Sequence, residues 1–337
     1  MKLMNVLPLI LVASLTACSN NQEKGYYSSN FYSFDTFVNI KIKHEYKELA
    51  ENALGRMQEI CEDLDKNFDA YKQRDITCLY DLNRTNDQIR IGKDLYTLLA
   101  VAKDNQEKAK YFNPLVGSLS NKWKEALEKN TVLSDEIIDE ELKKIEESSL
   151  ELSSESGQYF AKRTGEALID VGAIAKGYAL DRLQKNLPAY VPTNDYLVDA
   201  GTSSILLGTS ARERQGVEEG KYVIKIKELS KETYLHLNNC YISTSGTSEQ
   251  KTIIDGVTYS HIVDPFTGSA KSLYDAVIVV SDFNNEFNGT IGDMLSTSFM
   301  ISSLDEIKAV EASSKVKVVV IKDDKVLYKS ESIELFQ

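Results

Sequence analysis

The sequence predicts an α+β fold, and three features of its 337 residues support this. Segments with the helical repeat of apolar residues are interspersed with segments in which apolar and polar residues alternate, as they do in strands. Short turn-like stretches join neighbouring strand segments, so many of them are expected to pair as hairpins. Hydrophobic residues make up 42% of the chain, which is enough to bury one large domain or two intimate ones.

The N-terminal segment is predicted to be a removable targeting signal. Lys2 precedes an apolar run at residues 6–15, and the sequence LTAC at residues 15–18 follows the lipobox pattern. The run is too short to span a bilayer comfortably. Residues 1–17 are therefore expected to be a lipoprotein signal peptide, cleaved to leave Cys18 as a lipid-modified N-terminus.

The folded part is expected to begin after a tether. Residues 18–30 are polar and predict a lipidated flexible linker, and residues 31–337 would then form the folded domain. The protein would be extracytoplasmic and anchored by its lipid to the cell membrane.

Helices are expected where apolar residues recur at helical spacing. The segment at 134–147 opens with Ser and Asp as cap candidates, and the segment at 173–187 follows a turn-like Asp-Val-Gly. The predicted helices are residues 45–64, 93–110, 134–147, 173–187 and 286–302.

Strands are expected where the pattern alternates or where β-branched residues cluster. The predicted strands are residues 31–43, 196–207, 222–228, 257–263, 276–281 and 316–322.

The charge balance excludes one class of partner. The chain carries 51 acidic and 39 basic residues, a net charge of −12, so most of its surface would repel a nucleic acid. Any bound dinucleotide would need its phosphates neutralised locally by a metal ion, a lysine or a helix N-terminus.

The number and spacing of the cysteines do not indicate a set of disulfide bonds. Apart from Cys18 there are only Cys61, Cys78 and Cys240, widely spaced and without a CxxC pair. This favours neither disulfides nor a zinc site, so packing in the core is expected for all three.

The sequence LIDVGAIAKGYALD at residues 168–181 places an acid, a glycine turn and a lysine where a helix begins. Gly172 permits a tight turn, the free N–H groups of the first helical turn favour anions, and Lys176 adds a positive charge. A phosphate could bind there. The alternative is an ordinary strand-to-helix turn in which Asp170 is a cap.

The sequence YSHIVDPFTG at residues 259–268 contains the one histidine that stands in a motif. His261 precedes a polar turn and could act as a base or ligand. The alternative is a structural strand histidine. His44 and His236 lie in ordinary helix and strand patterns and are interpreted as incidental.

Asp293 and Thr297 are four residues apart in a predicted helix, so their oxygen atoms would lie on one face. A carboxylate and a hydroxyl, completed by a carbonyl, water and phosphates, suit a hard cation such as Mg²⁺. The alternative is that Asp293 is only a helix cap.

Aromatic residues gather in the segment 110–123. Tyr111, Phe112 and Trp123 could form a wall against a planar ring, or they could be core residues. Tyr71, within NFDAYK at residues 67–72, is a further aromatic residue in an exposed-looking context.

Together and in this order, these segments resemble the ApbE family of FAD:protein FMN transferases from about residue 34 to 303. NFDAYK, followed by Leu82-Asn83, is similar to that family's aromatic flavin segment, and YFNPLVG is similar to its FDPxVGP stretch. IDVGAIAKGYALD, YLVDAG, ISTSG, YSHIVDPFTG and GDMLSTS resemble its remaining blocks.

The resemblance implies two closely associated α/β parts with an FAD cleft between them. FMN would pass from FAD to a Thr or Ser hydroxyl of an acceptor, a membrane-associated or secreted redox protein facing the same compartment, and AMP would leave. Among the residues of this chain, His261 is the best candidate for the base that takes the proton of that hydroxyl. Mg²⁺ would be bound by Asp293, Thr297 and the backbone carbonyl of Ala173. The residues implied in flavin and nucleotide binding are Phe34, Tyr71, Tyr111, Phe112, Asn113, Asp170, Lys176, His261 and Ile262.

The chain departs from the family pattern at three places. Asn113 stands where the family usually has Asp, Phe34-Asp35-Thr36 replaces Met-Gly-Thr, and Thr202-Ser203 follows Gly201 where a second glycine is common. Two alternative functions remain. One is an FAD pyrophosphatase in which water replaces the acceptor hydroxyl, and the other is a non-enzymatic flavin- or solute-binding lipoprotein.

Overall fold

The structure, a computed structural model, describes residues 25–247 and 252–337. The predicted signal peptide and Cys18 lie outside the described residues. Helices are found at α1 (Lys47–Phe68), α2 (Leu79–Leu82), α3 (Lys93–Asp104), α4 (Gly117–Glu128), α5 (Asp135–Glu146), α6 (Gly172–Tyr190), α7 (Asn288–Phe299) and α8 (Leu304–Ser314), with a short 3-10 helix η1 (Pro114–Val116).

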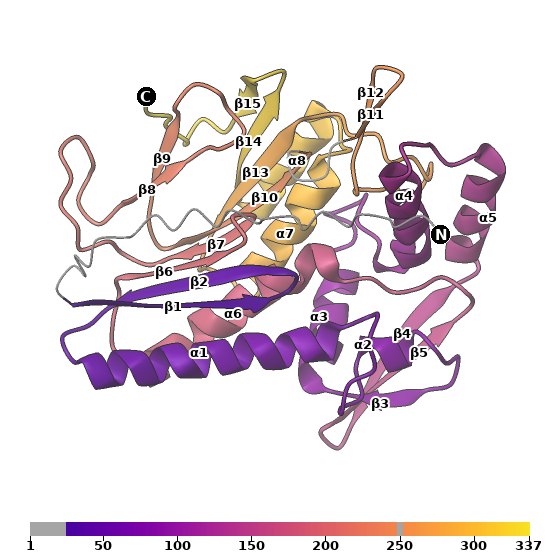
Figure 1. Ribbon diagram of the computed structural model, residues 1–337, viewed down its shortest axis with the longest axis horizontal. Helices are drawn as coiled ribbons and strands as arrows, with labels where there is room; N and C mark the ends of the chain where they lie inside the picture. Colours follow the sequence, from indigo (N-terminus) through magenta and orange to yellow (C-terminus); the bar gives the residue numbers. More distant parts are fainter. Residues whose placement is uncertain (1–24, 248–251) are drawn as a thin grey trace, which may run out of the picture.

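An antiparallel sheet of eight strands forms one part of the molecule (Figure 1). Its strands are, in spatial order, β1 (Tyr26–Ser33), β2 (Thr36–Lys43), β6 (Tyr196–Ala200), β7 (Ser204–Leu207), β10 (Cys240–Gly246), β13 (Ala276–Asp282), β14 (Lys317–Lys322) and β15 (Lys325–Lys329). The described residues also form three smaller sheets. One has three strands, in the order β3 (Ile89–Ile91), β5 (Gln158–Thr164) and β4 (Ser149–Glu155). The other two are the pairs β8 (Tyr222–Lys225) with β9 (Tyr234–Leu237), and β11 (Thr252–Ile254) with β12 (Val257–Tyr259).

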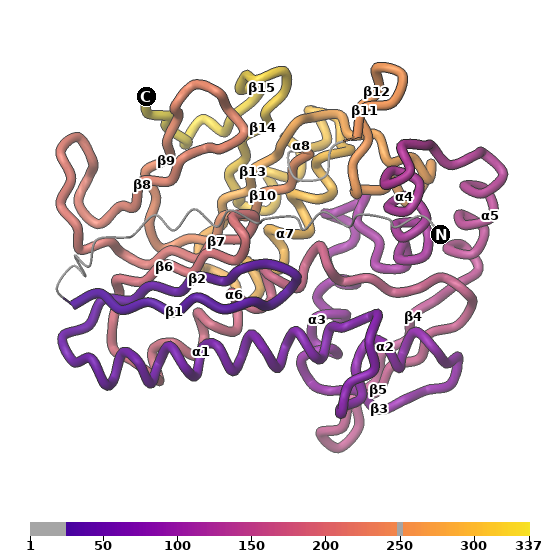
Figure 2. The backbone as a smooth tube through the Cα atoms, viewed as in Figure 1, coloured from indigo at the N-terminus to yellow at the C-terminus, as the bar shows by residue number. Residues whose placement is uncertain are grey.

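The large sheet separates two apolar layers. Helices α1, α6 and α7 pack against one face, where the side chains of Val38, Ile40 and Ile42 are fully buried. Hairpin β8–β9 and the C-terminal segment cover the other face over the later strands. Figure 2 shows α4, α5, the three-stranded sheet and hairpin β11–β12 gathered at the opposite end of the molecule. The predicted α+β class is confirmed.

Two further features of the described residues bear on the sequence predictions. Cys61, Cys78 and Cys240 are free and buried, which confirms that they pack in the core. Across residues 25–247 and 252–337, no helix has the length and apolar character that crossing a membrane requires.

Two predicted strands are in fact hairpins. The segment 31–43 folds back at Phe34 and Asp35, whose φ angles of 53° and 55° are those of a type I′ turn. The segment 196–207 folds back at Gly201 and Thr202, with φ angles of 68° and 64°. Alternation of apolar and polar residues continues across such tight turns, so periodicity alone does not reveal them.

Several predicted boundaries are also wrong. Strand β1 begins at Tyr26, so the last five residues of the predicted tether are paired with β2. The helix predicted at 93–110 ends at Asp104, where the Asn105 side chain donates to the carbonyl of Val101 (3.0 Å). The strands predicted at 222–228 and 257–263 end at Lys225 and Tyr259.

Helices α6 and α7 cross with their backbones in contact. A Cβ atom on Gly177 would lie 2.3 Å from the carbonyl oxygen of Gly289, and one on Gly289 would lie 2.6 Å from that of Gly177. Asp181 of α6 accepts hydrogen bonds from the backbone N–H groups of Gly289 and Thr290, both at 2.8 Å. It thus caps α7 from a neighbouring helix, because Phe287 at the N-cap position provides no side-chain bond.

We expect Gly177→Ala to lower the free energy of unfolding by about 2–3 kcal/mol, because the crossing leaves no space for a methyl group. Gly55→Ala is the matched control. Gly55 lies in α1, and nothing lies within 4 Å of the position that a methyl group would take, so alanine there should stabilise the helix by about 0.5–1 kcal/mol. Urea unfolding of both variants tests this, and equal stabilities would contradict the close crossing.

Candidate active site

A cavity of about 560 Å³ lies between the two parts of the molecule. Its walls come from the turn of hairpin β1–β2, the segment leading into η1, the start of α6, strands β7 and β10, and helix α7. The predicted site residues that line it are Tyr71, Tyr111, Phe112, Asn113, Asp170, Ala173, Lys176, His261, Ile262, Asp293 and Thr297.

Phe34 is the predicted contact that the structure places elsewhere. It is half-buried against the main core, and its backbone N–H donates to Asp65 (3.0 Å). The next residue of the turn, Asp35, lines the cavity instead. The pattern of the resembling family has a glycine at the position of Asp35. Aspartate tolerates the positive φ angle of this position, so the turn can form without the glycine.

Asp293 is the buried carboxylate of the cavity. It is 4% exposed, and its Oδ2 atom accepts from the backbone N–H of Gly177 (2.7 Å) across the helix crossing. The hydroxyl of Ser204 donates to the same carboxylate (3.0 Å to Oδ1). Burial raises the pKa of Asp293, while the positive charge of Lys176 and these hydrogen bonds oppose that rise. A positive ion beside the carboxylate would favour its charged form.

Hydroxyl groups surround the same end of the cavity. Ser245 of β10 lies 3.2 Å from the Thr297 hydroxyl and 2.9 Å from that of Ser296. Thr297 is one helical turn beyond Asp293 and lines the cavity with it, as predicted. Within the described ranges, no three His, Cys, Asp or Glu side chains cluster as metal ligands. The donor set seen here is therefore one carboxylate with hydroxyl oxygens, which fits a hard cation such as Mg²⁺ and not zinc.

The beginning of α6 offers a site for an anion. Asp170 accepts from the N–H of Gly172 (2.6 Å) and holds the turn, while Ala173 and Lys176 face the cavity from the first turns of the helix. The positive end of the helix and the Lys176 ammonium group both favour a phosphate there.

Tyr71 stands over this end of the cavity on a loop that Asp69 organises. Asp69 accepts from the N–H of Tyr71 (2.8 Å) and pairs with Arg74 (2.6 Å). The Tyr71 hydroxyl donates to Asp170 (3.2 Å) and is also 3.2 Å from the Asn121 side chain. Burial of the hydroxyl, together with the nearby Asp170 carboxylate, raises the pKa of Tyr71. Tyr71 as a whole is 62% exposed, so a planar ligand can reach it.

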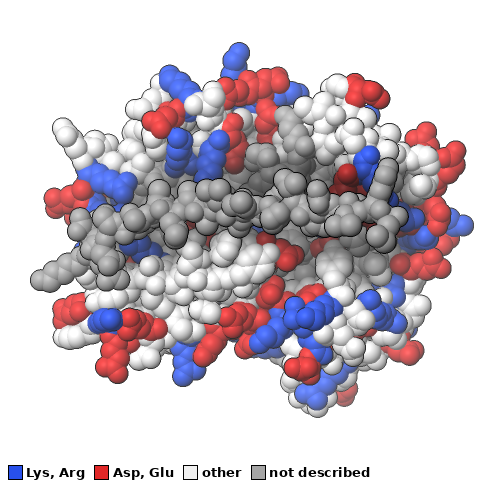
Figure 3. Space-filling view, in the orientation of Figure 1, with Lys and Arg blue, Asp and Glu red and all other residues white. Residues whose placement is uncertain are grey.

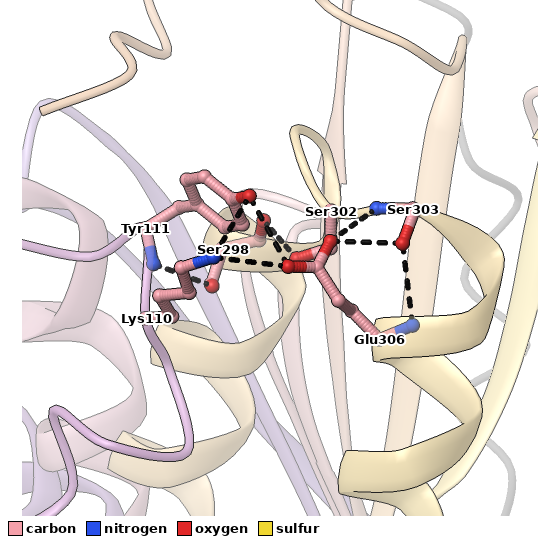
Figure 4. A network of polar contacts seen from close by, with 6 residues as sticks. All are labelled: Lys110, Tyr111, Ser298, Ser302, Ser303 and Glu306. Atoms are coloured by element: carbon pink, nitrogen blue, oxygen red, sulfur yellow. Dashed lines mark hydrogen bonds and ion pairs between the residues drawn. The ribbon is translucent and has the colours of Figure 1, made fainter. Parts of the chain in front are cut away.

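Tyr111 is fixed on the cavity wall by contacts with α7 and α8 (Figure 4). Its N–H donates to Ser298 (3.1 Å), and its hydroxyl donates to Glu306 (3.2 Å). Lys110 pairs with the same carboxylate oxygen (3.1 Å). Hydrogen bonds from the backbone and hydroxyl of Ser303, and then the Lys110 ammonium group, lower the pKa of Glu306 to about 2.

This anchor predicts a pH dependence. Because the pKa of Glu306 lies below its ordinary value of 4.5, its contribution is complete above about pH 4.5 and is lost as pH falls towards 2. We expect wild type to be more stable than Glu306→Gln at pH 6 by about 0.5 kcal/mol, a small value because the pair is exposed. This difference should vanish by about pH 2. Urea unfolding across this range tests it, with Asp305→Asn as the neighbouring control; a pH-independent gap would contradict it.

His261 lies on an ordered segment at the cavity wall. It is exposed and lines the cavity, while the flanking residues are fixed. The N–H of Ile262 donates to Ser260 (3.2 Å), and Asp264 accepts from the N–H of Phe266 (2.8 Å) and from the hydroxyl of Thr267 (2.8 Å).

The other two histidines lie outside the cavity lining. His44 is half-buried before α1, and His236 stacks on Phe336 with 3.7 Å between ring centroids. Trp123 is a core residue and not part of the aromatic wall. It is 2% exposed, stacks on Tyr259, and donates its indole N–H to the carbonyl of Gly268 (2.7 Å).

Several lining residues were not predicted as site residues from the sequence. They are polar residues from turns, strands and helices: Asp35, Asn121, Lys124, Thr202, Ser203, Ser204, Thr244, Ser245 and Ser296. The run of hydroxyl residues in β10 was the one available signal, because alternate residues of a strand share a face. Ser204 carried no signal at all, since its partner Asp293 is 89 residues away.

Comparison with known proteins points to one family. The family model described as "ApbE family" matches residues 34–320. A FAD:protein FMN transferase of Treponema pallidum is 26% identical over 190 residues, 53% of this chain and 52% of the relative. One of Buchnera aphidicola is 22% identical and covers 77% of this chain and 76% of the relative. The chain thus spans about half the length of the first of these relatives.

Solved structures show the same fold. The ApbE protein from Thermotoga maritima superposes with a TM-score of 0.72 at 22% identity, covering 91% of this chain and 97% of the other. The flavin transferase ApbE from Vibrio cholerae superposes with a TM-score of 0.70 at 22% identity, with the same coverage of both chains.

Proposed function

Because the chain belongs to the ApbE family, we propose that it transfers FMN from FAD to a Thr or Ser hydroxyl of an acceptor protein and releases AMP. The observation that carries this is the arrangement of one cavity. The buried carboxylate of Asp293 and the hydroxyl of Thr297 lie beside the start of α6, which carries Lys176. His261 lies on the wall of the same cavity. FAD would be the substrate.

The pyrophosphate of FAD would lie between Lys176 and the Asp293 end of the cavity. A magnesium ion held by Asp293, Thr297 and the carbonyl of Ala173 would supply positive charge to the phosphate oxygens. Lys176 and the N-terminus of α6 add to it. Tyr71, Tyr111 and Phe112 would contact the flavin.

The reaction forms one bond to phosphorus and breaks another. The acceptor hydroxyl attacks the phosphorus nearer the flavin, and the pyrophosphate bond breaks so that AMP leaves with the bridging oxygen. His261 takes the proton of the attacking hydroxyl. Its place on a cavity wall opened to solvent lets an acceptor side chain approach it.

The direct test is mass spectrometry of a candidate acceptor after incubation with the protein, FAD and Mg²⁺. Covalent FMN on a Thr or Ser residue supports the proposal. Free FMN and AMP without a modified acceptor would instead identify a pyrophosphatase, in which water attacks at the same site. Flavin binding without AMP release would identify a flavin-binding lipoprotein.

The protein would act outside the cytoplasm, bound to the membrane through Cys18, on redox proteins of the same compartment. We expect Cys18→Ala to leave the chain unprocessed or to release it from membranes, because the lipid is attached through that thiol. Membrane fractionation and intact-mass analysis test this. A variant that is still processed and still sediments with membranes would refute the lipid anchor.

A further inference from the structure

One face of hairpin β1–β2 is turned away from the core and carries no acidic side chain. Side chains alternate across each strand, so every second residue points outward. The strand register pairs these outward residues directly, Tyr26 with Lys43 at one end and Tyr32 with Phe37 at the other. The outer face of the hairpin consists of Tyr26, Ser28, Asn30, Tyr32, Phe37, Asn39, Lys41 and Lys43. The outer face thus has two lysines and no acidic side chain, in a chain whose net charge is −12.

The end of the outer face near the cavity is aromatic. Tyr32 and Phe37 are each 61% exposed, and their rings meet edge to face with centroids 5.6 Å apart. They flank the turn whose residue Asp35 lines the cavity. A pair of large exposed rings is a typical contact surface for a partner or a membrane interface.

The other end of the outer face is basic. The ammonium groups of Lys41 and Lys43 lie 4.6 Å and 5.5 Å from the ring centroid of Tyr26, and the guanidinium of Arg212 lies 4.6 Å from it. Asp195, which accepts from the Tyr26 hydroxyl (2.6 Å), holds this ring in place. Three cations are thus gathered around one tyrosine.

Within the described residues, the middle and the aromatic end of the outer face are left open by the rest of the fold, whereas Arg212 covers part of Tyr26 at the basic end. Hairpin β8–β9 covers the same side of the large sheet only over the later strands. Ser28, Asn30, Tyr32, Phe37 and Asn39 are all exposed. Figure 3 shows mainly uncharged surface below the grey residues, where Figure 1 places the middle of the hairpin.

We propose that the outer face of hairpin β1–β2 docks on an anionic membrane surface. This inference rests on the proposed lipid at Cys18. Eight residue steps separate Cys18 from Tyr26, a reach of at most ~28 Å, so the tether holds the basic end close to the bilayer. Aromatic residues prefer the interface between lipid and water, and clustered Lys and Arg side chains bind anionic headgroups.

Docking in this orientation would hold the cavity mouth beside the membrane. Asp35 joins the outer face to the cavity, and Thr202 and Ser203 line the adjacent rim.

Covalent footprinting of the processed, lipidated protein tests this orientation. The protein is reconstituted in phosphatidylcholine vesicles with about 30% phosphatidylglycerol, or kept in detergent, and treated with an amine-reactive reagent. We expect Lys41 and Lys43 to react at least about fivefold more slowly in the vesicles than in detergent. Exposed Lys129 in the C-cap of α4 and Lys325 at the far edge of the sheet are internal controls and should react equally in both.

A double variant tests the aromatic end. Tyr32→Ser with Phe37→Ser removes only exposed rings, so the fold should persist, and Lys41 and Lys43 should regain most of their reactivity in vesicles. The proposal would be overturned if wild-type protein floats with the vesicles and its Lys41 and Lys43 still react as fast as they do in detergent. Protection that requires an added acceptor protein would also overturn it and assign the face to the acceptor.

Two further measurements, flotation with vesicles and AMP release, test the lipid anchor and the transfer reaction separately from membrane docking. A chain that does not float with vesicles refutes the lipid anchor and the docking together. AMP release measured in detergent tests the transfer reaction alone, so its loss leaves the footprinting result valid.

Discussion

Asp293→Asn is expected to reduce magnesium-dependent AMP release by about 10³-fold or more, because it removes the only carboxylate assigned to the cation. Asparagine keeps an oxygen that can accept from the N–H of Gly177 and the hydroxyl of Ser204, so the crossing of α6 and α7 should remain intact. Alanine is a poorer test. It would leave both donors buried without an acceptor, at a cost of about 1–3 kcal/mol each.

The measurement is AMP release over a range of Mg²⁺ concentrations, with circular dichroism as the check on folding. Ser204→Ala is the matched control, since it removes one hydrogen bond to Asp293 but leaves the carboxylate. Its turnover at saturating Mg²⁺ should fall by no more than about tenfold. If wild type turns over normally with a chelator present, the metal has no part in the reaction.

His261→Ala is expected to slow FMN transfer by about 10²- to 10⁴-fold, the contribution of a positioned general base. FAD and Mg²⁺ should still bind. The segment around His261 is held by Ser260 and Asp264 through bonds that do not involve the imidazole, so the variant should fold. Flavin fluorescence titration reports binding and AMP release reports chemistry, both on one preparation.

His236→Asn is the control for this variant, because His236 stacks on Phe336 outside the cavity lining and its loss should leave turnover unchanged. A different outcome would reassign His261. If FAD affinity collapses while turnover per bound flavin stays normal, His261 contacts the flavin. Catalysis would then rest on the cation and Lys176, with solvent taking the proton.

The sequence predicted long helices well and tight turns poorly. The helix predicted at 134–147 is α5, Asp135–Glu146, because its periodicity is a local signal; Ser134 takes the N-cap position, although its side chain makes no capping hydrogen bond. The turns at Phe34-Asp35 and Gly201-Thr202 were missed, because hairpin partners have the same alternation as one continuous strand.

The same distinction applies to the site. Asp293 and Thr297 could be predicted as one face of a helix from their spacing of four residues. Ser204 and Ser245 could not, because they approach α7 only after β7 and β10 have paired in the sheet. Phe34 was predicted to face the cavity, but Asp35 does so instead. Which of two adjacent turn residues faces the cavity depends on the geometry of the turn, and the sequence did not reveal this turn.

The crossing at Gly177 and Gly289 also determines which wall of the cavity can adapt to a ligand. Helices in backbone contact cannot slide without a clash, so Lys176 on α6 and Asp293 on α7 keep a fixed spacing and form a rigid wall. Tyr111 is also anchored, through its backbone N–H to Ser298 and its hydroxyl to Glu306, whereas Tyr71 lies on an exposed loop and its side chain is held by hydrogen bonds of the hydroxyl. Entry of a large substrate and departure of its products are therefore expected to be accommodated by the loop that carries Tyr71, while the phosphate-binding side stays still.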